Sequence, residues 1–197
     1  QGEGGVLPME KEFVSGLAQF CKEKDLLLIV DEVQTGIGHT GKLFCFEHYG
    51  IRPDVVSCAK GLGGGLPIGA VLCTEKLGSV LGAGAHGTTF GGNPVVCAGA
   101  LAVLSRLEQP AFLAEVREKG EYLKKGLLST PGISGVRGIG MMLGAALKSG
   151  DAGKIAAACV KNGLLILTAK DVLRLLPPLT ITREEIDTGL AVLRQTL

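Results

Sequence analysis

Residues 26–31 read LLLIVD, and residues 55–60 read VVSCAK. Each stretch is a short apolar run that ends in a charged residue, Asp31 in the first and Lys60 in the second. Runs of this length and composition predict buried strands, and the spacing of about 30 residues matches one strand–crossover–strand unit. If the strands are parallel neighbours, both side chains lie at the carboxyl edge of one sheet, where open α/β sheets bind ligands.

The residues after Lys60, GLGGG at 61–65, place little bulk around its amine. Because Asp31 ends a run expected to be buried, we expect its carboxylate to be buried too. A lysine in this setting can form an imine with an aldehyde cofactor, and Asp31 can keep a ring nitrogen of that cofactor protonated. Two plainer interpretations stay open. Lys60 can be a solvated surface residue, and Asp31 can cap the turn after its strand. Strand alternation points Glu32 the other way, so we expect a structural role for it.

The composition narrows the possible partners. The chain has 197 residues, 46% of them hydrophobic, and a mean hydropathy of +0.37, so we expect a large aliphatic core. A net charge of +1, from 20 basic and 19 acidic residues, gives no support for a nucleic-acid or membrane-surface partner. No apolar run has the length of a membrane span. The six cysteines and three histidines lack metal-ligand spacing, which predicts no metal site, reduced thiols and a cytoplasmic location.

Apolar periodicity and turn signals predict five helices and seven strands. The residue pattern changes near Gln109 and Pro110 from an apolar, Ala-rich stretch to a charged, amphipathic one. We therefore expect a first domain over residues 1–108 and a small α+β domain over 109–197. The expected helices cover residues 9–24, 94–107, 112–128, 152–162 and 182–197, the last with a capping box from Thr182 to Glu185. The expected strands cover residues 26–30, 55–59, 68–74, 133–140, 141–147, 164–167 and 172–176.

Two further stretches carry polar groups that suit a ligand. Residues 86–94, HGTTFGGNP, combine the hydroxyls of Thr88 and Thr89 with glycines and a following helix, which predicts an anion site or an ordinary loop. Arg174 stands alone inside the apolar run 172–176. Because a buried arginine needs a partner, we expect a carboxylate there, from a ligand or from a structural acid.

The opening residues, QGEGG, contain no initiating Met and resemble the interior of a loop, so we expect a piece of a longer protein. Glu3 in this stretch can neutralise Arg174 while no substrate is bound, or it can be an exposed loop residue without a specific role.

Five blocks of the chain, taken together and in order, resemble the class-III pyridoxal-phosphate-dependent aminotransferases of fold type I. The blocks are QGEGGV at 1–6, IVDEVQTGIGHTG at 29–41, PDVVSCAKGLGGGLPIGA at 53–70, HGTTFGGNPVVCAGALAVL at 86–104 and LTAKDVLRLLPPLTIT at 167–182. The resemblance implies an α/β fold, with part of a mostly parallel, three-layer large domain followed by the small α+β domain. It also implies that the family's amino-terminal half, with the main phosphate cup, lies outside this chain.

The resemblance also implies roles for particular residues. Lys60 matches the lysine that forms the internal aldimine with pyridoxal 5'-phosphate, and Asp31 matches the carboxylate at the pyridine nitrogen. The remaining matches are Val33 on one ring face, Gln34 near the phenolic oxygen, Thr89 at the cofactor phosphate of the other subunit, Arg174 at the substrate carboxylate, and Glu3 as its gate. Thr88, beside Thr89, is expected to bind the cofactor as well. A homodimer with shared active sites follows from the match at Thr89.

The activity implied is transamination of N-acetylornithine with 2-oxoglutarate, as in arginine biosynthesis. Ornithine or 4-aminobutyrate as the amino donor, an aminomutase, and a catalytically incomplete fragment are the alternatives. A dinucleotide-binding domain is disfavoured because the glycines after Lys60 lack the GxGxxG spacing.

Overall fold

The computed structural model describes residues 1–197 and divides into two compact units, each described here by itself. The lysine unit, named after Lys60, comprises Glu10–Gly38 and Lys42–Phe112. The arginine unit, named after Arg174, comprises Gln1–Met9, His39–Gly41 and Leu113–Leu197. The expected boundary between residues 108 and 109 stays a prediction about the domains of the protein. The arginine unit takes up the chain at Leu113 and also includes two earlier segments.

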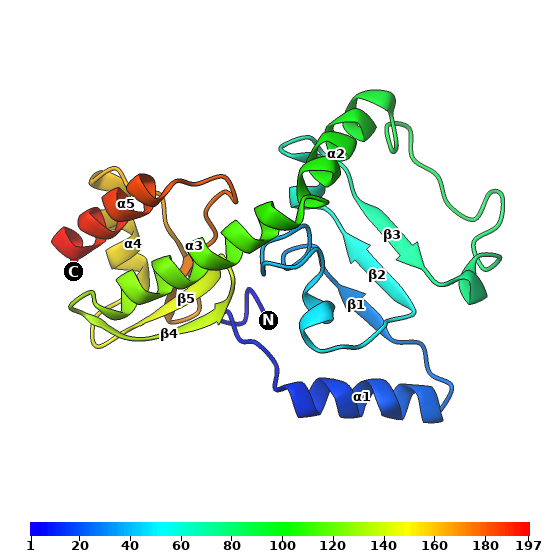
Figure 1. Ribbon diagram of the computed structural model, residues 1–197, viewed down its shortest axis with the longest axis horizontal. Helices are drawn as coiled ribbons and strands as arrows, with labels where there is room; N and C mark the ends of the chain where they lie inside the picture. The colour runs from blue at the N-terminus through cyan, green and yellow to red at the C-terminus, as the bar shows by residue number, and fades with distance from the viewer. The chain divides into compact units, whose positions relative to one another are not determined.

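The lysine unit is built on a three-stranded sheet in the order β1-β2-β3. Figure 1 shows the three strands side by side, with α1 beyond β1. The elements are α1 (Lys11–Glu23), β1 (Ile29–Asp31), the 3₁₀ helix η1 (Cys45–His48), β2 (Val55–Cys58), η2 (Lys60–Gly63), β3 (Ala70–Cys73), η3 (Glu75–Leu77) and α2 (Pro94–Leu107).

The pairing of β1 with β2 is parallel, as the spacing of the two apolar runs predicts. Ile29 lies opposite Val55, and Asp31 lies opposite Ser57. The pairing of β2 with β3 is antiparallel, with Ser57 opposite Val71. The three-stranded sheet of this unit is therefore mixed, with the expected parallel pair and one antiparallel strand. An apolar run predicts a strand but does not encode its direction, which depends on the connection that precedes it.

The two apolar strands were expected to be buried, and the structure corrects this for β1. Val56 and Cys58 of β2 are buried, but Ile29 is 64% exposed and Val71 of β3 is 67% exposed. A continuous apolar run needs cover on both faces of its sheet. Within residues 1–197, too few elements pack on the lysine unit to supply it. Asp31 and Lys60 are exposed as well, so the carboxylate is not the buried group that the sequence predicted.

The arginine unit has a four-stranded antiparallel sheet in the order β4-β5-β7-β6. Its elements are α3 (Pro110–Leu128) from Leu113 onward, β4 (Ile133–Ile139), β5 (Met142–Leu147), α4 (Ala152–Lys161), β6 (Leu167–Ala169), β7 (Val172–Leu175) and α5 (Arg183–Thr196). Helices α3, α4 and α5 lie within two residues of their expected bounds at each end. Strand β6 begins at Leu167, where the expected strand ended, because Leu164 packs into the helical core instead.

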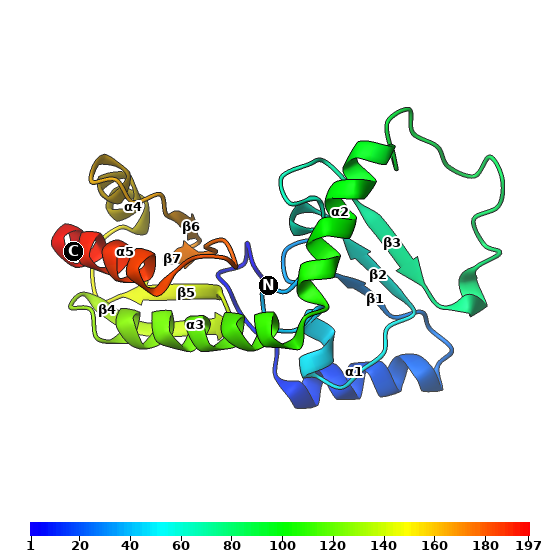
Figure 2. The same ribbon diagram turned by 45° about the horizontal axis from the view of Figure 1, so that its top comes forward.

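Side chains of this sheet alternate between two faces, as strand geometry requires. Leu143, Ala145 and Leu173 pack with residues of α3, α4 and α5 in the main core of the unit. Met142 and Val172 point to the other face, where they form a second cluster with Val6 from the opening segment. The helices therefore cover one face, and the opening segment lies against the other (Figure 2).

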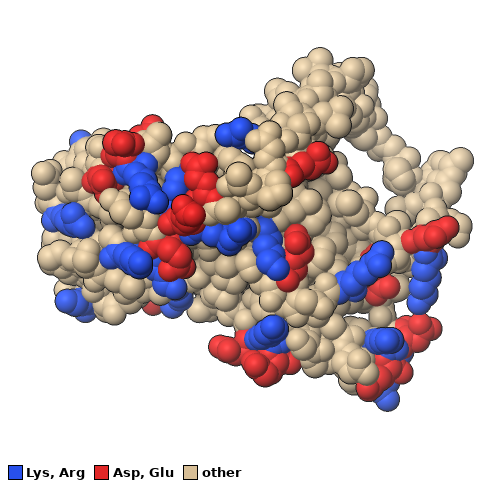
Figure 3. Space-filling view, viewed as in Figure 1, with Lys and Arg blue, Asp and Glu red and all other residues tan.

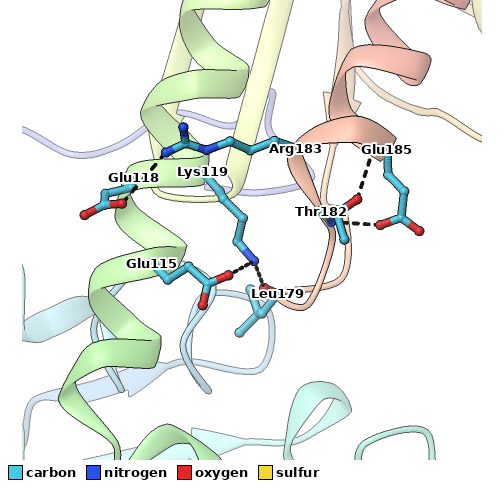
Figure 4. A network of polar contacts seen from close by, with 7 residues as sticks. All are labelled: Glu115, Glu118, Lys119, Leu179, Thr182, Arg183 and Glu185. Atoms are coloured by element: carbon cyan, nitrogen blue, oxygen red, sulfur yellow. Dashed lines mark hydrogen bonds and ion pairs between the residues drawn. The ribbon is translucent and has the colours of Figure 1, made fainter.

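A polar network joins α3, α5 and the segment that follows β7 (Figure 4). Lys119 is 4% exposed, and its Nζ donates to the Leu179 carbonyl at 2.8 Å and contacts Glu115 Oε1 at 3.0 Å. The expected capping box is confirmed. The Glu185 amide donates to the Thr182 hydroxyl at 3.2 Å, and the Thr182 amide donates to the Glu185 carboxylate at 2.8 Å. The network holds the chain between β7 and α5 in one position.

We expect Lys119→Ala to lower the free energy of unfolding by on the order of 2 kcal/mol, because a hydrogen bond and a buried aliphatic stem are both lost. Lys125→Ala, at an exposed position of the same helix, serves as the control and should change the value by less than about 0.5 kcal/mol. Urea unfolding followed by circular dichroism measures both variants. Equal losses in the two variants would show that the Lys119 contacts contribute nothing specific.

Charge is distributed unevenly along the chain. No Asp, Glu, Lys or Arg occurs from Leu77 to Ser105, and Figure 3 shows this part of the face in view as almost uncharged, with mixed charges elsewhere.

No single helix is long and apolar enough to cross a membrane. Only α2 and α3 taken together reach that length and composition, and the chain bends at a break between them.

Candidate active site

Asp31 ends β1 at the carboxyl edge of the parallel pair. Its Oδ1 accepts a hydrogen bond from the Val33 amide at 2.8 Å and another from the Ser57 hydroxyl at 3.3 Å. Ser57 lies opposite Asp31 in the β1–β2 register, three positions before Lys60. Both donors engage one oxygen, so Oδ2 is left for a group outside the chain. The carboxylate is fixed in direction while one face of it stays accessible.

Glu32 stabilises the loop that follows Asp31. It is 1% exposed, and its Oε1 accepts a hydrogen bond from the Phe46 amide at 2.9 Å while Oε2 accepts one from the Thr35 hydroxyl. The Glu32 amide donates to the Ser57 carbonyl at 2.8 Å. These contacts tie the loop from Val33 to Gly36 to β2. The structural role expected for Glu32 fits this arrangement, and its buried hydrogen bonds set where Val33 and Gln34 lie.

Lys60 begins η2 two residues after the end of β2, in a left-handed backbone conformation with φ 45°. A non-glycine residue in this region is strained, and strain of this kind is often kept where a side chain has a functional direction. The loop after it is held by α2. A Cβ on Gly99 of α2 would lie 3.3 Å from the Gly63 carbonyl oxygen and 2.7 Å from Leu66 Cδ1. Close packing against α2 therefore fixes the backbone that presents Lys60.

We expect Lys60→Gly to be more stable toward unfolding than Lys60→Ala by on the order of 1 kcal/mol, because only glycine adopts a left-handed conformation without strain. Both variants lack the amine, so their difference reports the backbone alone. Thermal unfolding of the two proteins side by side measures it. If Lys60→Ala is the more stable of the two, the backbone at this position is not strained.

Thr88 and Thr89 lie in the exposed loop between η3 and α2. The loop packs on itself, since a Cβ on Gly91 would lie 2.0 Å from Thr88 Cγ2. The Asn93 side chain caps α2 and accepts hydrogen bonds from the amides of Val95 at 3.1 Å and Val96 at 3.2 Å. The anion site expected here therefore cannot use these two amides. The exposed hydroxyls of Thr88 and Thr89 are the groups that an anion could reach.

Arg174 and Glu3 form an ion pair in the arginine unit through Arg174 Nη1 and Glu3 Oε1. The Arg174 side chain is only 12% exposed, whereas that of Glu3 is 70% exposed. The carboxylate expected beside Arg174 is thus a side chain of the same unit. Because the glutamate is mostly in solvent, a ligand carboxylate of similar charge could replace it at Arg174.

The structure brings the candidate residues together in two groups. Asp31, Val33, Gln34 and Lys60 lie at or just after the ends of two paired strands in the lysine unit, and Arg174 and Glu3 are paired in the arginine unit.

Burial raises the pKa of the Cys58 thiol, which favours its neutral form and makes it a poor nucleophile. All six cysteines are free thiols.

The sequence analysis did not single out Arg137, which donates from Nε to the Gly5 carbonyl at 2.6 Å. The signal was available, because Arg137 lies inside the apolar strand expected over 133–140 just as Arg174 lies inside 172–176. The Arg137 side chain is 35% exposed and that of Arg174 is 12% exposed, so the argument that a buried arginine needs a partner applies more weakly to Arg137.

The groups in the lysine unit fit a cofactor with an aldehyde and a basic ring nitrogen. A carboxylate with one oxygen available and an exposed lysine amine follow adjacent parallel strands at the same edge. The amine suits reaction with a carbonyl, and the carboxylate suits a protonated nitrogen.

Comparison with known proteins agrees with this chemistry. A family model described as Aminotransferase class-III matches residues 1–197. An acetylornithine aminotransferase of Haemophilus ducreyi is 47% identical over 198 residues, which cover 100% of this chain and 50% of the relative. A succinylornithine transaminase of Yersinia pseudotuberculosis is 47% identical over 199 residues, covering 97% of this chain and 48% of the relative.

Among solved structures, the N-acetylornithine aminotransferase of Stenotrophomonas maltophilia K279a matches with a TM-score of 0.90 and 40% identity. The match covers 100% of this chain and 53% of that one. The chain therefore spans about half the length of the curated relatives it matches. The α/β fold expected from the sequence is confirmed by this likeness.

Proposed function

Since the chain belongs to the class-III aminotransferase family, we propose that it supplies the catalytic lysine and the ring-binding carboxylate of a pyridoxal-phosphate-dependent transaminase. Class-III aminotransferases depend on this cofactor as a family. The observation that carries the proposal is the placement of Asp31 and Lys60 after two paired parallel strands, at one edge of the sheet. The exposed Lys60 amine and the available Asp31 oxygen support it.

Pyridoxal phosphate, when bound, supplies an aldehyde that reacts with amines and a ring that accepts an electron pair from the substrate carbon. Asp31 keeps a proton on the ring nitrogen, since the Val33 amide and the Ser57 hydroxyl hold its carboxylate in place. Lys60 Nζ would take a proton from the substrate carbon as general base and deliver it, as general acid, to the carbon that carries the cofactor's aldehyde. The strained, tightly packed backbone around Lys60 fixes where its side chain leaves the chain.

The other lysine-unit residues would hold the cofactor without reacting. In this proposal Val33 packs on one face of the ring, and Gln34 binds near its phenolic oxygen. Thr88 and Thr89 offer hydroxyls to a phosphate, and in this proposal the phosphate near Thr89 belongs to the other subunit of a homodimer. The exposure of both threonines agrees with a contact outside this chain.

Arg174 and Glu3 suit a transaminase whose two substrates differ in where their carboxylates lie. The α-nitrogen of N-acetylornithine is an amide, so its reactive amine is the distal one, on a carbon without a carboxylate. Glutamate and 2-oxoglutarate carry a carboxylate on the reacting carbon. We propose that Glu3 neutralises Arg174 for the first substrate and releases it for the second, with the ion pair as the supporting observation.

We propose N-acetylornithine as the amino donor and 2-oxoglutarate as the acceptor, in the cytoplasm, because the relatives named above act on acylated ornithines and the cysteines are free. The test uses the protein expressed from its complete reading frame, assayed with N-acetylornithine, N-succinylornithine, ornithine and 4-aminobutyrate. We expect the highest kcat/KM with N-acetylornithine. Turnover of ornithine or 4-aminobutyrate alone would replace this proposal with its alternative.

The exposed apolar strands and the half-length match favour one other possibility, that the 197-residue chain by itself is catalytically incomplete. Adding pyridoxal phosphate to this chain alone tests it by absorbance. A spectrum of bound cofactor together with turnover would exclude the incomplete-chain interpretation.

We expect Arg174→Ala to raise the KM for 2-oxoglutarate by on the order of 30-fold or more, because a desolvated charged hydrogen bond costs about 2–5 kcal/mol when one partner is removed. The KM for the amino donor should change much less, since its reacting carbon bears no carboxylate. Steady-state kinetics with each substrate varied measures both constants. Arg183→Ala, at a mostly exposed arginine, is the control. An unchanged KM for 2-oxoglutarate in Arg174→Ala would contradict this role.

A further inference from the structure

Two arginines of the antiparallel sheet stand in one row, separated by a glycine. Arg137 of β4 lies opposite Gly144 of β5, and Gly144 lies opposite Arg174 of β7. Directly paired residues of neighbouring strands point to the same face of a sheet. Both guanidinium groups therefore lie on the face that the opening segment covers, and β5 places no side chain of its own between them.

The opening segment forms a compact turn on this face. The amides of Gly5 and Val6 both donate to the Gly2 carbonyl, at 3.2 and 3.0 Å. Val6 is 3% exposed and has φ 55°, and it lies directly over Gly144, where an added Cβ would be 3.0 Å from Val6 Cβ. Val6 thus anchors the turn in the core, and Glu3 lies within the turn.

Arg137 is the second anchor of the turn. Its Nε donates to the Gly5 carbonyl at 2.6 Å, and its Nη2 lies 3.6 Å from Asp171 Oδ1. The guanidinium lies so close to the turn that a Cβ on Gly5 would be 2.6 Å from Nη2. Gly5 also has φ 118°, a backbone conformation that favours glycine. With its Nε engaged by Gly5 and Asp171 beside it, Arg137 is unsuited to binding a substrate directly.

We propose that Arg137 is a positioning residue that holds the turn so that Glu3 can neutralise Arg174, and that it thereby sets the affinity of Arg174 for substrate carboxylates. This inference rests on the proposed function for its consequence in catalysis. Loosening the turn weakens the Glu3–Arg174 pair, so a ligand carboxylate meets less competition at Arg174. The affinity for dicarboxylates therefore rises when Arg137 is lost, whereas a general structural defect would lower it.

The test measures binding of glutarate, a dicarboxylate that cannot be transaminated, to the protein from its complete reading frame saturated with pyridoxal phosphate. We expect Arg137→Met to lower the Kd of glutarate by roughly 2- to 10-fold, the factor that one hydrogen bond contributes. Arg137→Lys, which can still donate to the Gly5 carbonyl and pair with Asp171, should restore most of the original value. Isothermal titration calorimetry gives each constant without turnover.

A double-mutant cycle with Glu3→Gln separates positioning from a merely structural role. In Glu3→Gln the competing charge is absent, so Arg137→Met should leave the Kd of glutarate unchanged there. Gly144→Ala displaces Val6 without altering Arg137, and it should shift the Kd in the same direction as Arg137→Met. This second variant keeps the test valid if Arg137→Met does not fold.

The outcomes separate this inference from the proposed function. Three results would overturn the inference. The first is that Arg137→Met changes the Kd of glutarate equally in the presence of Glu3 and in Glu3→Gln. The others are that Arg137→Met weakens the binding of glutarate, or that glutarate does not bind even to Glu3→Gln. Lack of transamination by the unaltered protein with every donor would overturn the proposed function. The glutarate cycle would still report on Arg137 in that case.

Discussion

Lys60→Ala should abolish transamination in the protein expressed from its complete reading frame. The amine is the only group in the proposal that moves the proton on the substrate carbon, and general acid–base catalysis alone contributes about 10²- to 10⁴-fold. Loss of the covalent link to the cofactor adds to this effect, so turnover should fall below detection. The visible absorbance of the bound cofactor should change as well. A coupled assay for glutamate formation and an absorbance spectrum measure the two effects.

Lys76→Ala is the matched control, because Lys76 makes an exposed ion pair with Asp25 and lies outside the strand edge. An exposed pair contributes about 0–1 kcal/mol, so this variant should keep its activity and its spectrum. Turnover by Lys60→Ala close to that of Lys76→Ala would refute the catalytic assignment of Lys60.

Asp31→Asn should lower kcat by on the order of 100-fold or more, the effect of removing one preorganised electrostatic contact to developing charge. An amide keeps the shape of the side chain and can still accept from the Val33 amide, but it carries no negative charge to hold a proton on the ring nitrogen. The fold should therefore survive while the chemistry slows. Single-turnover rates measured with the amino donor report the step directly.

The control for this variant is Asp54→Asn. Asp54 precedes β2 at the opposite end of the strand pair, where its Oδ2 accepts from the Leu28 amide at 2.9 Å. Its carboxylate is at the wrong edge for the cofactor, so the rate should stay within about 3-fold of the original. Equal losses in Asp31→Asn and Asp54→Asn would mean that the effect is one of folding.

Much of the lysine unit could be predicted from local pattern. The length of the two apolar runs and their spacing predicted a parallel pair, and the pairing of β1 with β2 confirms it. Strand β2 ends at Cys58, two residues before Lys60. The direction of β3 and the exposure of Ile29 could not be predicted, because they depend on which elements are present to pair with and cover the sheet. The left-handed backbone of Lys60 was also missed, since only glycine announces that conformation in a sequence.

In the arginine unit, the capping box at Thr182 and the bounds of the helices followed from local signals that the structure keeps. Arg174 was found because an arginine inside an apolar strand is costly, and its partner in the structure is Glu3. The row from Arg137 through Gly144 to Arg174 could not be found in the same way. It depends on strand register across three strands, which no local pattern specifies.

The most direct test of the central claim is to locate the lysine that binds the cofactor. The protein is incubated with pyridoxal phosphate, reduced with borohydride, digested and mapped by mass spectrometry. We predict that the mass of one reduced cofactor is found on the peptide that contains Lys60 and disappears in Lys60→Ala. Attachment to another lysine with Lys60 unmodified would contradict the account.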